Sequence, residues 1–135
     1  MSNVRILVVA GHAMIGALLG ALVELAGYRP LFADVDERPD AAIERLEPDL
    51  VLLDCELAAA AEDDAYRAAF EAGSRLLLFG SSLTAVETER FAARRGAPCI
   101  TLPIGYTAFS ERVKALLDDR SERTVARELR DGASA

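Results

Sequence analysis

The chain has 135 residues, of which 52% are apolar and 27% are charged. This length predicts one domain with a buried core, and the composition is typical of a folded protein. The net charge of −7 at pH 7 disfavours non-specific binding of nucleic acid, which depends on positive charge. Cys55 and Cys99 are far apart in the chain, and His12 is the single histidine. These counts argue against a disulfide framework, a zinc site or a multi-histidine metal cluster, and they fit a reducing cytosol.

The apolar segment Ile6–Ala26 has two interpretations. With Arg5 in front of it, and interrupted only by His12 and Glu24, it resembles a signal anchor or a membrane helix. Its first half, however, is rich in β-forming residues and is broken by Gly11, and an alternating strand–helix pattern follows it to the end. We therefore expect a strand and then a helix of a cytoplasmic protein.

Hydrophobic patterning predicts strands that alternate with helices along the chain. We expect strands at Arg5–Ala10, Arg29–Val35, Leu50–Leu53, Arg75–Phe79 and Cys99–Leu102. We expect helices at Ala13–Ala26, Pro39–Leu46, Glu62–Ala72, Thr84–Arg95 and from Thr107 to at least Asp118. The segments Cys55–Ala61 and 80–82 are expected to be loops.

Several residues predict where these helices begin and end. Thr84 and Glu87 have the spacing of a capping box, and Thr107 is a candidate cap for the last helix. Three helices are followed by a glycine, which is typical of a helix C-terminus: Gly27, Gly73 and Gly96.

The first helix is apolar around most of its circumference. Its expected core stripe contains Ile15, Leu18, Leu19, Leu22 and Leu25. Its expected outer face carries small residues, namely Ala13, Gly16, Ala17, Gly20 and Ala21. Small residues at this spacing permit close approach of another helix, so this face is either a docking or dimer surface or an ordinary alanine-rich surface.

The alternation predicts an α/β fold of five strand–helix units, with a parallel sheet between two layers of helices. The flavodoxin-like strand order 2-1-3-4-5 is the commonest at this size, and it places His12 and Asp54 on the same rim of the sheet. We expect residues 1–118 to form this domain and residues 119–135 to form a polar tail that extends the last helix. The tail carries arginines at helical spacing, which we interpret as a solvated helix end: Arg120, Arg123, Arg127 and Arg130.

The order of several motifs resembles a two-component response-regulator receiver domain (CheY-like). The resemblance covers about residues 4 to 118. It rests on the opening Ile6-Leu7-Val8-Val9, Leu25-x-Gly27-Tyr28, the block Pro48-Asp49-Leu50-Val51-Leu52-Leu53-Asp54, Gly96-Ala97 and Pro103.

The resemblance implies that Asp54 is the phospho-acceptor position. The acidic pair that holds Mg²⁺ in the family corresponds to Ala10 and Gly11, the Thr or Ser position to Gly80, and the Lys position to Leu102. Phosphoryl transfer depends on positive charge near the transferred group, and Mg²⁺ depends on fixed oxygen ligands. The sequence therefore indicates a degenerate receiver, or pseudo-receiver, with no cofactor and with weak or absent Mg²⁺ binding.

These observations predict a non-enzymatic, cytoplasmic signalling protein that acts through protein–protein contacts. Its expected partners are a signalling protein, a histidine kinase or phosphotransferase, or a second copy of the chain, and neither nucleic acid nor a membrane. The expected contact surfaces are the first helix, or the face made by the fourth helix, the fifth strand and the fifth helix.

Two alternative functions stay open. One is a single-domain response regulator that is phosphorylated on Asp54, with His12 or Ser81 compensating for the missing residues. The other is a small-molecule sensor with a pocket at the strand rim formed by His12, Cys55, Ser81, Ser82 and Pro103. A dinucleotide site is disfavoured, because Gly11, Gly16 and Gly20 have G-x4-G-x3-G spacing in place of G-x-G-x-x-G.

Overall fold

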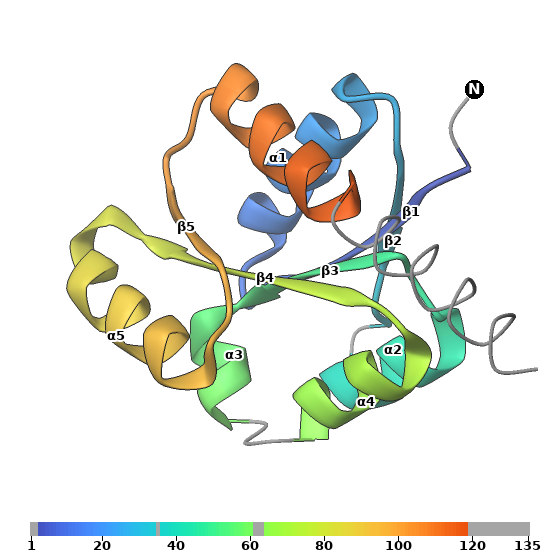
Figure 1. The fold of residues 1–135 in the computed structure, drawn as a ribbon. Helices are drawn as coiled ribbons and strands as arrows, with labels where there is room; N and C mark the ends of the chain where they lie inside the picture. The colour runs from blue at the N-terminus through green and yellow to red at the C-terminus, as the bar shows by residue number, and fades with distance from the viewer. Residues whose placement is uncertain (1–2, 35, 61–63, 119–135) are drawn as a thin grey trace, which may run out of the picture.

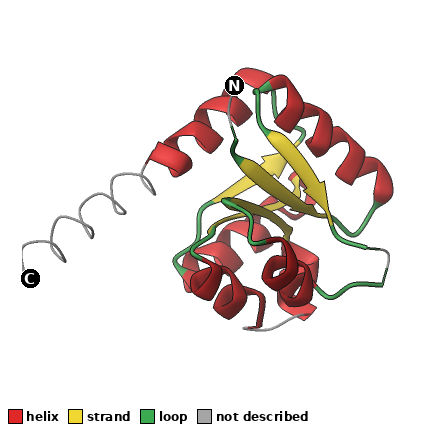
Figure 2. Ribbon diagram, turned by 90° about the vertical axis from the view of Figure 1, so that its right-hand side faces the viewer, coloured by secondary structure: helices red, strands yellow, loops and turns green. Residues whose placement is uncertain are grey.

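The computed structural model describes residues 3–34, 36–60 and 64–118. These residues form a five-stranded sheet of order β2-β1-β3-β4-β5, in which every neighbouring pair is parallel. Helices cover both faces of the sheet (Figures 1 and 2). The predicted flavodoxin-like fold and strand order are confirmed.

The elements follow the predicted alternation closely. The strands are β1 (Arg5–Val9), β2 (Arg29–Phe32), β3 (Leu50–Asp54), β4 (Arg75–Ser81) and β5 (Cys99–Leu102). The helices are α1 (Ala13–Leu25), α2 (Pro39–Leu46), α3 (Cys55–Ala60), α4 (Asp64–Ala72), the 3-10 turn η1 (Ser82–Thr84) and α5 (Ala85–Arg95). The last helix, here called the C-terminal helix, covers 106–118 in the described part of the chain. The predicted tail, 119–135, lies outside the described residues.

The sheet separates two cores, and β3 contributes to both because its side chains alternate between the faces. All five residues of β3 are buried. Leu52 belongs to a core that includes Leu19 of α1 and Phe109 of the C-terminal helix. Leu53 belongs to a second core with Ile43 of α2 and small residues of α4 and α5. Figure 1 accordingly shows α1 and the C-terminal helix on one side of the sheet and α2, α4 and α5 on the other.

The predicted loop at Cys55–Ala61 is wrong, because helix α3 begins directly after β3. The side chain of Asp54 accepts a hydrogen bond from the Glu56 N–H in the first turn of α3 (3.0 Å), as a helix N-cap does. The sequence that follows is rich in alanine, the residue type with the highest helix propensity. These two effects start a helix in the segment that was predicted to be a loop.

Thr84 is the N-cap residue of α5, as predicted, but its side chain makes no capping bond; its hydroxyl donates to the Ser81 carbonyl instead (3.3 Å). The predicted cap at Thr107 is wrong. Thr107 lies inside the C-terminal helix, whose Phe109 N–H donates to the Gly105 carbonyl (3.0 Å). The three helix-ending glycines are confirmed, since all have positive φ: Gly27 (89°), Gly73 (72°) and Gly96 (64°).

The predicted faces of α1 need correction. Leu18 and Leu25 were expected in the core but are 49% and 69% exposed. Gly16 and Gly20 were expected on the outer face but are buried. A Cβ at Gly20 would lie 2.6 Å from the ring of Phe32, so glycine lets α1 approach β2 closely. Gly16 and Gly20 thus serve packing within the domain, whereas Ala13, Ala17 and Ala21 are exposed as predicted.

No helix in the described ranges is both long enough and apolar enough to span a membrane.

Candidate functional site

A cavity of about 460 Å³ opens at the carboxyl ends of the strands, between the first turn of α1 and helix α5. This is the edge at which ligands bind in open parallel sheets. Its apolar walls are Ile15, Phe79, Phe91 and Leu102. Its charged lining residues are Asp54, Glu56, Glu87 and Arg94, and the remaining ones are small or polar. His12 and Asp54 lie together at this rim, as the strand order required.

Asp54 is the most buried carboxylate of the site, with 9% of its surface exposed. Its Oδ2 accepts the Gly11 N–H and its Oδ1 accepts the Glu56 N–H, both at 3.0 Å. The end of β3 places it there, because β3 lies between β1 and β4 in the sheet. Each oxygen of Asp54 therefore accepts one backbone N–H, from two different segments of the chain.

The positions that correspond to an acidic pair carry no oxygen ligand. A Cβ at Gly11 would lie 3.4 Å from Oδ2 of Asp54, so position 11 faces the carboxylate but presents only its N–H. Ala10 packs against the core beside α1. Among the residues that the structure describes, no three Asp, Glu, His or Cys side chains form a group that could hold a metal ion. The residues around Asp54 therefore do not fit Mg²⁺, which depends on fixed oxygen ligands.

Gly80 leaves no room for a hydroxyl-bearing side chain. A Cβ at this position would lie 2.2 Å from Oγ1 of Thr88, well inside contact distance. Thr88 belongs to α5 and is 2% exposed. The next residue, Ser81, lines the cavity, and its hydroxyl accepts the Leu83 N–H at 3.0 Å. Helix α5 thus occupies the space into which a Thr or Ser at position 80 would project.

Position 102 contributes to the core and to the cavity wall. Leu102 is 8% exposed and packs in the same core as Leu52 and Phe109. The single lysine of the chain, Lys114, is exposed on the C-terminal helix. The cation that lines the cavity is instead Arg94 of α5.

Cys55 lines the cavity, and Cys99 lies on β5. Burial raises the pKa of the Cys55 thiol, although a hydrogen bond with Thr88 opposes the rise. Burial also raises the pKa of the Cys99 thiol. Since the thiolate is the reactive form, these raised pKa values keep both half-buried cysteines in the less reactive thiol form at neutral pH.

The remaining pocket candidates divide into two groups. His12 and Ser81 line the cavity together with Cys55, whereas Ser82 and Pro103 are exposed and lie outside its lining. Sequence reasoning missed the contribution of η1 and α5: Thr84 comes from η1, and α5 supplies Glu87, Thr88, Phe91 and Arg94. Their spacing of three and four residues marks a single helical face, and this signal was present in the sequence.

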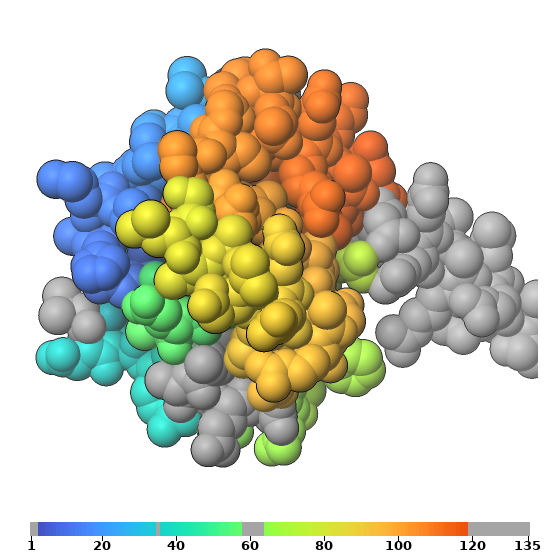
Figure 3. All heavy atoms as spheres, turned by 90° about the vertical axis from the view of Figure 1, so that its left-hand side faces the viewer, coloured from blue at the N-terminus to red at the C-terminus, as the bar shows by residue number. Residues whose placement is uncertain are grey.

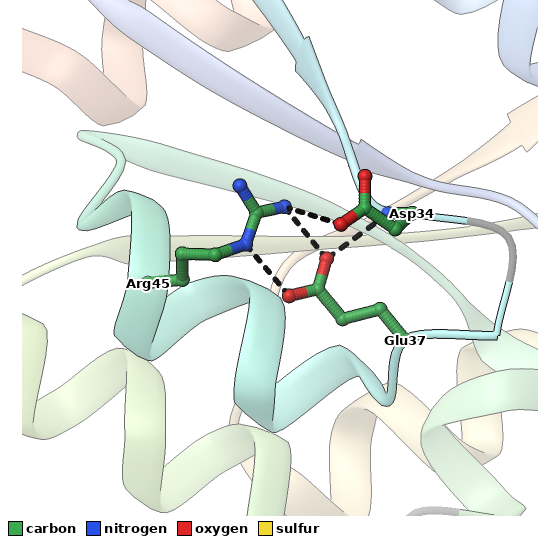
Figure 4. A network of polar contacts seen from close by, with 3 residues as sticks. All are labelled: Asp34, Glu37 and Arg45. Carbon is green, nitrogen blue, oxygen red and sulfur yellow. Dashed lines mark hydrogen bonds and ion pairs between the residues drawn. The ribbon is translucent and has the colours of Figure 1, made fainter.

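A second cavity of about 710 Å³ adjoins the first and shares His12 with it. It reaches the connection between β2 and α2, where Arg45 holds Glu37 through bonds from Nε (2.8 Å) and Nη2 (2.7 Å) (Figure 4). The Asp34 N–H also donates to Glu37 (3.0 Å), and the Asp34 carboxylate lies 3.7 Å from Arg45. These bonds lower the pKa of Glu37 to about 2.

No protein-family model matches the chain, and no curated protein matches it in sequence. Solved structures do match. NtrX from Brucella abortus in complex with ATP has a TM-score of 0.76 at 23% identity, over 95% of this chain and 29% of NtrX. A response regulator receiver protein from Burkholderia phymatum has a TM-score of 0.70 at 20% identity, over 86% of this chain and 96% of that protein.

The chain has the fold of a response-regulator receiver domain. A third similar structure belongs to a family of redox sensors in the streptococci that evolved from two-component response regulators. Its TM-score is 0.73 at 17% identity, over 92% of this chain and 55% of that one. The receiver fold thus covers nearly all of this chain, while the chain spans less than a third of NtrX. At these identities the likeness concerns the fold, and function has to be argued from the site.

Proposed function

We propose that this chain is a signalling protein of the receiver type that acts through protein–protein contacts, without Mg²⁺-dependent phosphorylation of Asp54. The observation that carries the proposal is the environment of Asp54. Its oxygens accept the N–H groups of Gly11 and Glu56, and Thr88 occupies the space beside Gly80. Phosphoryl transfer proceeds by positioning and by neutralising charge on oxygen, and these neighbours supply neither a metal ligand nor a lysine. The chain is accordingly not an enzyme in this proposal.

The exposed side of α1 supports a role in protein contacts. Met14, Leu18 and Leu25 lie on one side of the helix and are 84%, 49% and 69% exposed. The Tyr106 hydroxyl donates to the Leu25 carbonyl (3.1 Å), so the C-terminal helix borders the same surface. Contiguous exposed apolar side chains mark interaction sites. We assign this surface to a cytoplasmic signalling partner, such as a histidine kinase or phosphotransferase, or to a second copy of the chain.

The alternative is slow phosphorylation of Asp54. It is favoured by the position of this carboxylate at the end of β3, where it lines an open cavity. His12 and Ser81 line the same cavity, although the Ser81 hydroxyl already accepts a backbone N–H. The two functions differ in one measurable property, which is covalent uptake of phosphoryl on Asp54.

A phosphodonor assay separates these functions. The purified chain and its Asp54→Ala variant are incubated with Mg²⁺ and a small-molecule phosphodonor, and intact masses are measured. We expect no gain of a phosphoryl group that depends on Asp54, because the described residues around the carboxylate provide neither a metal site nor a lysine at position 102 to neutralise the developing charge. A receiver that retains its acidic pair and lysine serves as the positive control. A phosphoryl adduct on the natural chain that disappears in Asp54→Ala would overturn the proposal.

Titration with Mg²⁺ gives a second readout. The amide signals of Gly11 and Glu56 report directly on the carboxylate to which they donate. We expect them to be unaffected by millimolar Mg²⁺ in an NMR titration. Saturable shifts of both signals would show that the ion displaces these bonds and would favour the phosphorylation alternative.

A further inference from the structure

The cavity beside Asp54 has the size and the walls of a small-molecule site. Its volume of about 460 Å³ falls within the range of roughly 300–1,000 Å³ that is typical of such sites. Its apolar walls come from separate elements, with Ile15 on α1, Phe79 on β4 and Phe91 on α5. Two of these side chains are aromatic rings, which favour contact with a flat, apolar body.

The cavity lies between segments that carry exposed apolar residues. Met14 is next in sequence to the lining residue Ile15, and Leu83 to Thr84, and the two are 84% and 93% exposed. Figure 3 shows the face on which the start of α1 (blue), α3 (green) and the η1–α5 segment (yellow) lie next to one another.

The charges of the lining are unbalanced toward negative. Three carboxylates line the cavity, from Asp54, Glu56 and Glu87, against the single guanidinium of Arg94. Glu56 and Glu87 are exposed, and neither makes an ion pair with another described residue. Each oxygen of Asp54 accepts one backbone N–H and keeps capacity for a second hydrogen bond.

We propose that this cavity binds a small organic cation, an amine or guanidinium carried on an apolar, ring-bearing body. The charged end lies toward Asp54, Glu56 and Glu87, and the body lies against the aromatic walls. An organic anion would meet three carboxylates, and a bare metal ion would leave the apolar walls uncovered. The proposal goes beyond the signalling role and does not depend on it, because it rests only on the cavity and its lining.

A matched set of small probes tests the class of ligand. Phenethylamine carries both features, phenethyl alcohol lacks the charge, phenylpropanoate reverses it, and methylammonium lacks the body. Affinities are measured by NMR titration on the Gly11 and Glu56 amides, which donate to Asp54 in the cavity lining. We expect phenethylamine to bind most tightly, with at least about fivefold preference over the alcohol, in line with contacts to more than one carboxylate. Equal or tighter binding of the alcohol, the anion or methylammonium, or no saturable binding of phenethylamine at millimolar concentration, would overturn the proposal.

Variants locate the binding within the cavity. The double change Glu56→Gln and Glu87→Gln is expected to weaken phenethylamine binding about tenfold, from about threefold for each exposed charge pair. Glu89→Gln is the matched control, because Glu89 is exposed on α5 and does not line the cavity. Thr84→Trp places a large side chain at an exposed lining position and is expected to abolish binding while circular dichroism stays unchanged. Unchanged affinity in the double variant or in the folded Thr84→Trp variant, or an equal loss in Glu89→Gln, would contradict this site.

Discussion

Asp54 is a carboxylate held by backbone groups. Each of its oxygens accepts one N–H, from Gly11 at the end of β1 and from Glu56 at the start of α3. A side chain that joins two segments in this way acts as a structural acceptor, because its removal leaves two donors to find other partners. This role differs from that of a carboxylate in an acidic cluster, where removal relieves repulsion between like charges.

The variant Asp54→Ala tests this difference. We expect it to lower the free energy of unfolding by about 1–3 kcal/mol, because the partly buried Gly11 and Glu56 N–H groups lose their acceptor. Asp54→Asn is the control. Its amide oxygen still accepts one hydrogen bond, so we expect a smaller decrease in the free energy of unfolding. Urea denaturation followed by circular dichroism measures both. An increase in stability in Asp54→Ala would indicate an acidic cluster.

Of the two glycines beside Asp54 and Thr88, Gly80 has less room for a side chain than Gly11. We expect Gly80→Ala to cost about 1–3 kcal/mol, because its Cβ would lie 2.2 Å from Oγ1 of Thr88 and α5 would have to move. Combining it with Thr88→Ala should recover part of the loss. Gly105→Ala is the matched control, since a Cβ there meets nothing within 4 Å. Equal melting temperatures for Gly80→Ala and Gly105→Ala would show that α5 can shift to accommodate the added Cβ at little cost in stability.

At the scale of elements, the connection from β2 to α2 is held by the network of Asp34, Glu37 and Arg45 (Figure 4). Hydrogen bonds from Arg45 and from the Asp34 N–H lower the pKa of Glu37 from 4.5 to about 2. The fold therefore favours the ionised carboxylate. This contribution to stability is complete above pH 4.5 and is lost as the pH falls through about 2.

The variant Glu37→Gln is expected to show this pH dependence. Its melting temperature should lie below that of the natural chain near neutral pH, and the difference should shrink as the pH falls toward 2. Glu44→Gln, an exposed change on α2, the helix that carries Arg45, should not alter stability at either pH. A difference for Glu37→Gln that is constant with pH would mean that the network contributes packing and not charge.

At the scale of the whole molecule, one sheet supports two cores. Leu52 and Leu53 are neighbours on β3, both fully buried, and they belong to opposite cores. Because β3 is hydrogen-bonded on both sides, to β1 and to β4, loss of either core removes support from the central strand of the sheet. The two halves should therefore unfold together, as small single domains usually do.

The variants Leu52→Ala and Leu53→Ala measure this coupling. Each is expected to lower the free energy of unfolding by about 2–5 kcal/mol, through lost burial and the cavity left behind. In both variants, circular dichroism and the protection of backbone amides from hydrogen exchange on the two sides of the sheet should report one common urea midpoint. Separate midpoints for the two sides of the sheet would contradict a single cooperative unit.

Much of the fold could be predicted from the sequence because its signals are local. The apolar run Leu50–Leu53 marks a strand buried on both faces, and glycines such as Gly27 adopt the positive φ that ends a helix. Alternating strands and helices then imply a parallel sheet with few allowed orders. The errors arose where signals overlapped. Alanines after Asp54 form helix α3, and on the nearly uniform surface of α1 apolar spacing does not select a buried face.

By itself, the sequence determined the strand–helix alternation, the position of Asp54 at the rim, and the absence of acidic and lysine side chains at positions 10, 11 and 102. Only the tertiary structure decided what replaced them: the backbone donors on Asp54, the Thr88 hydroxyl beside Gly80 and the acidic, apolar-walled cavity. The physical reason is that these contacts join residues from separate elements. Whether these residues contact one another depends on the orientation of α5 and on its distance from β4. The packing of the whole domain determines both.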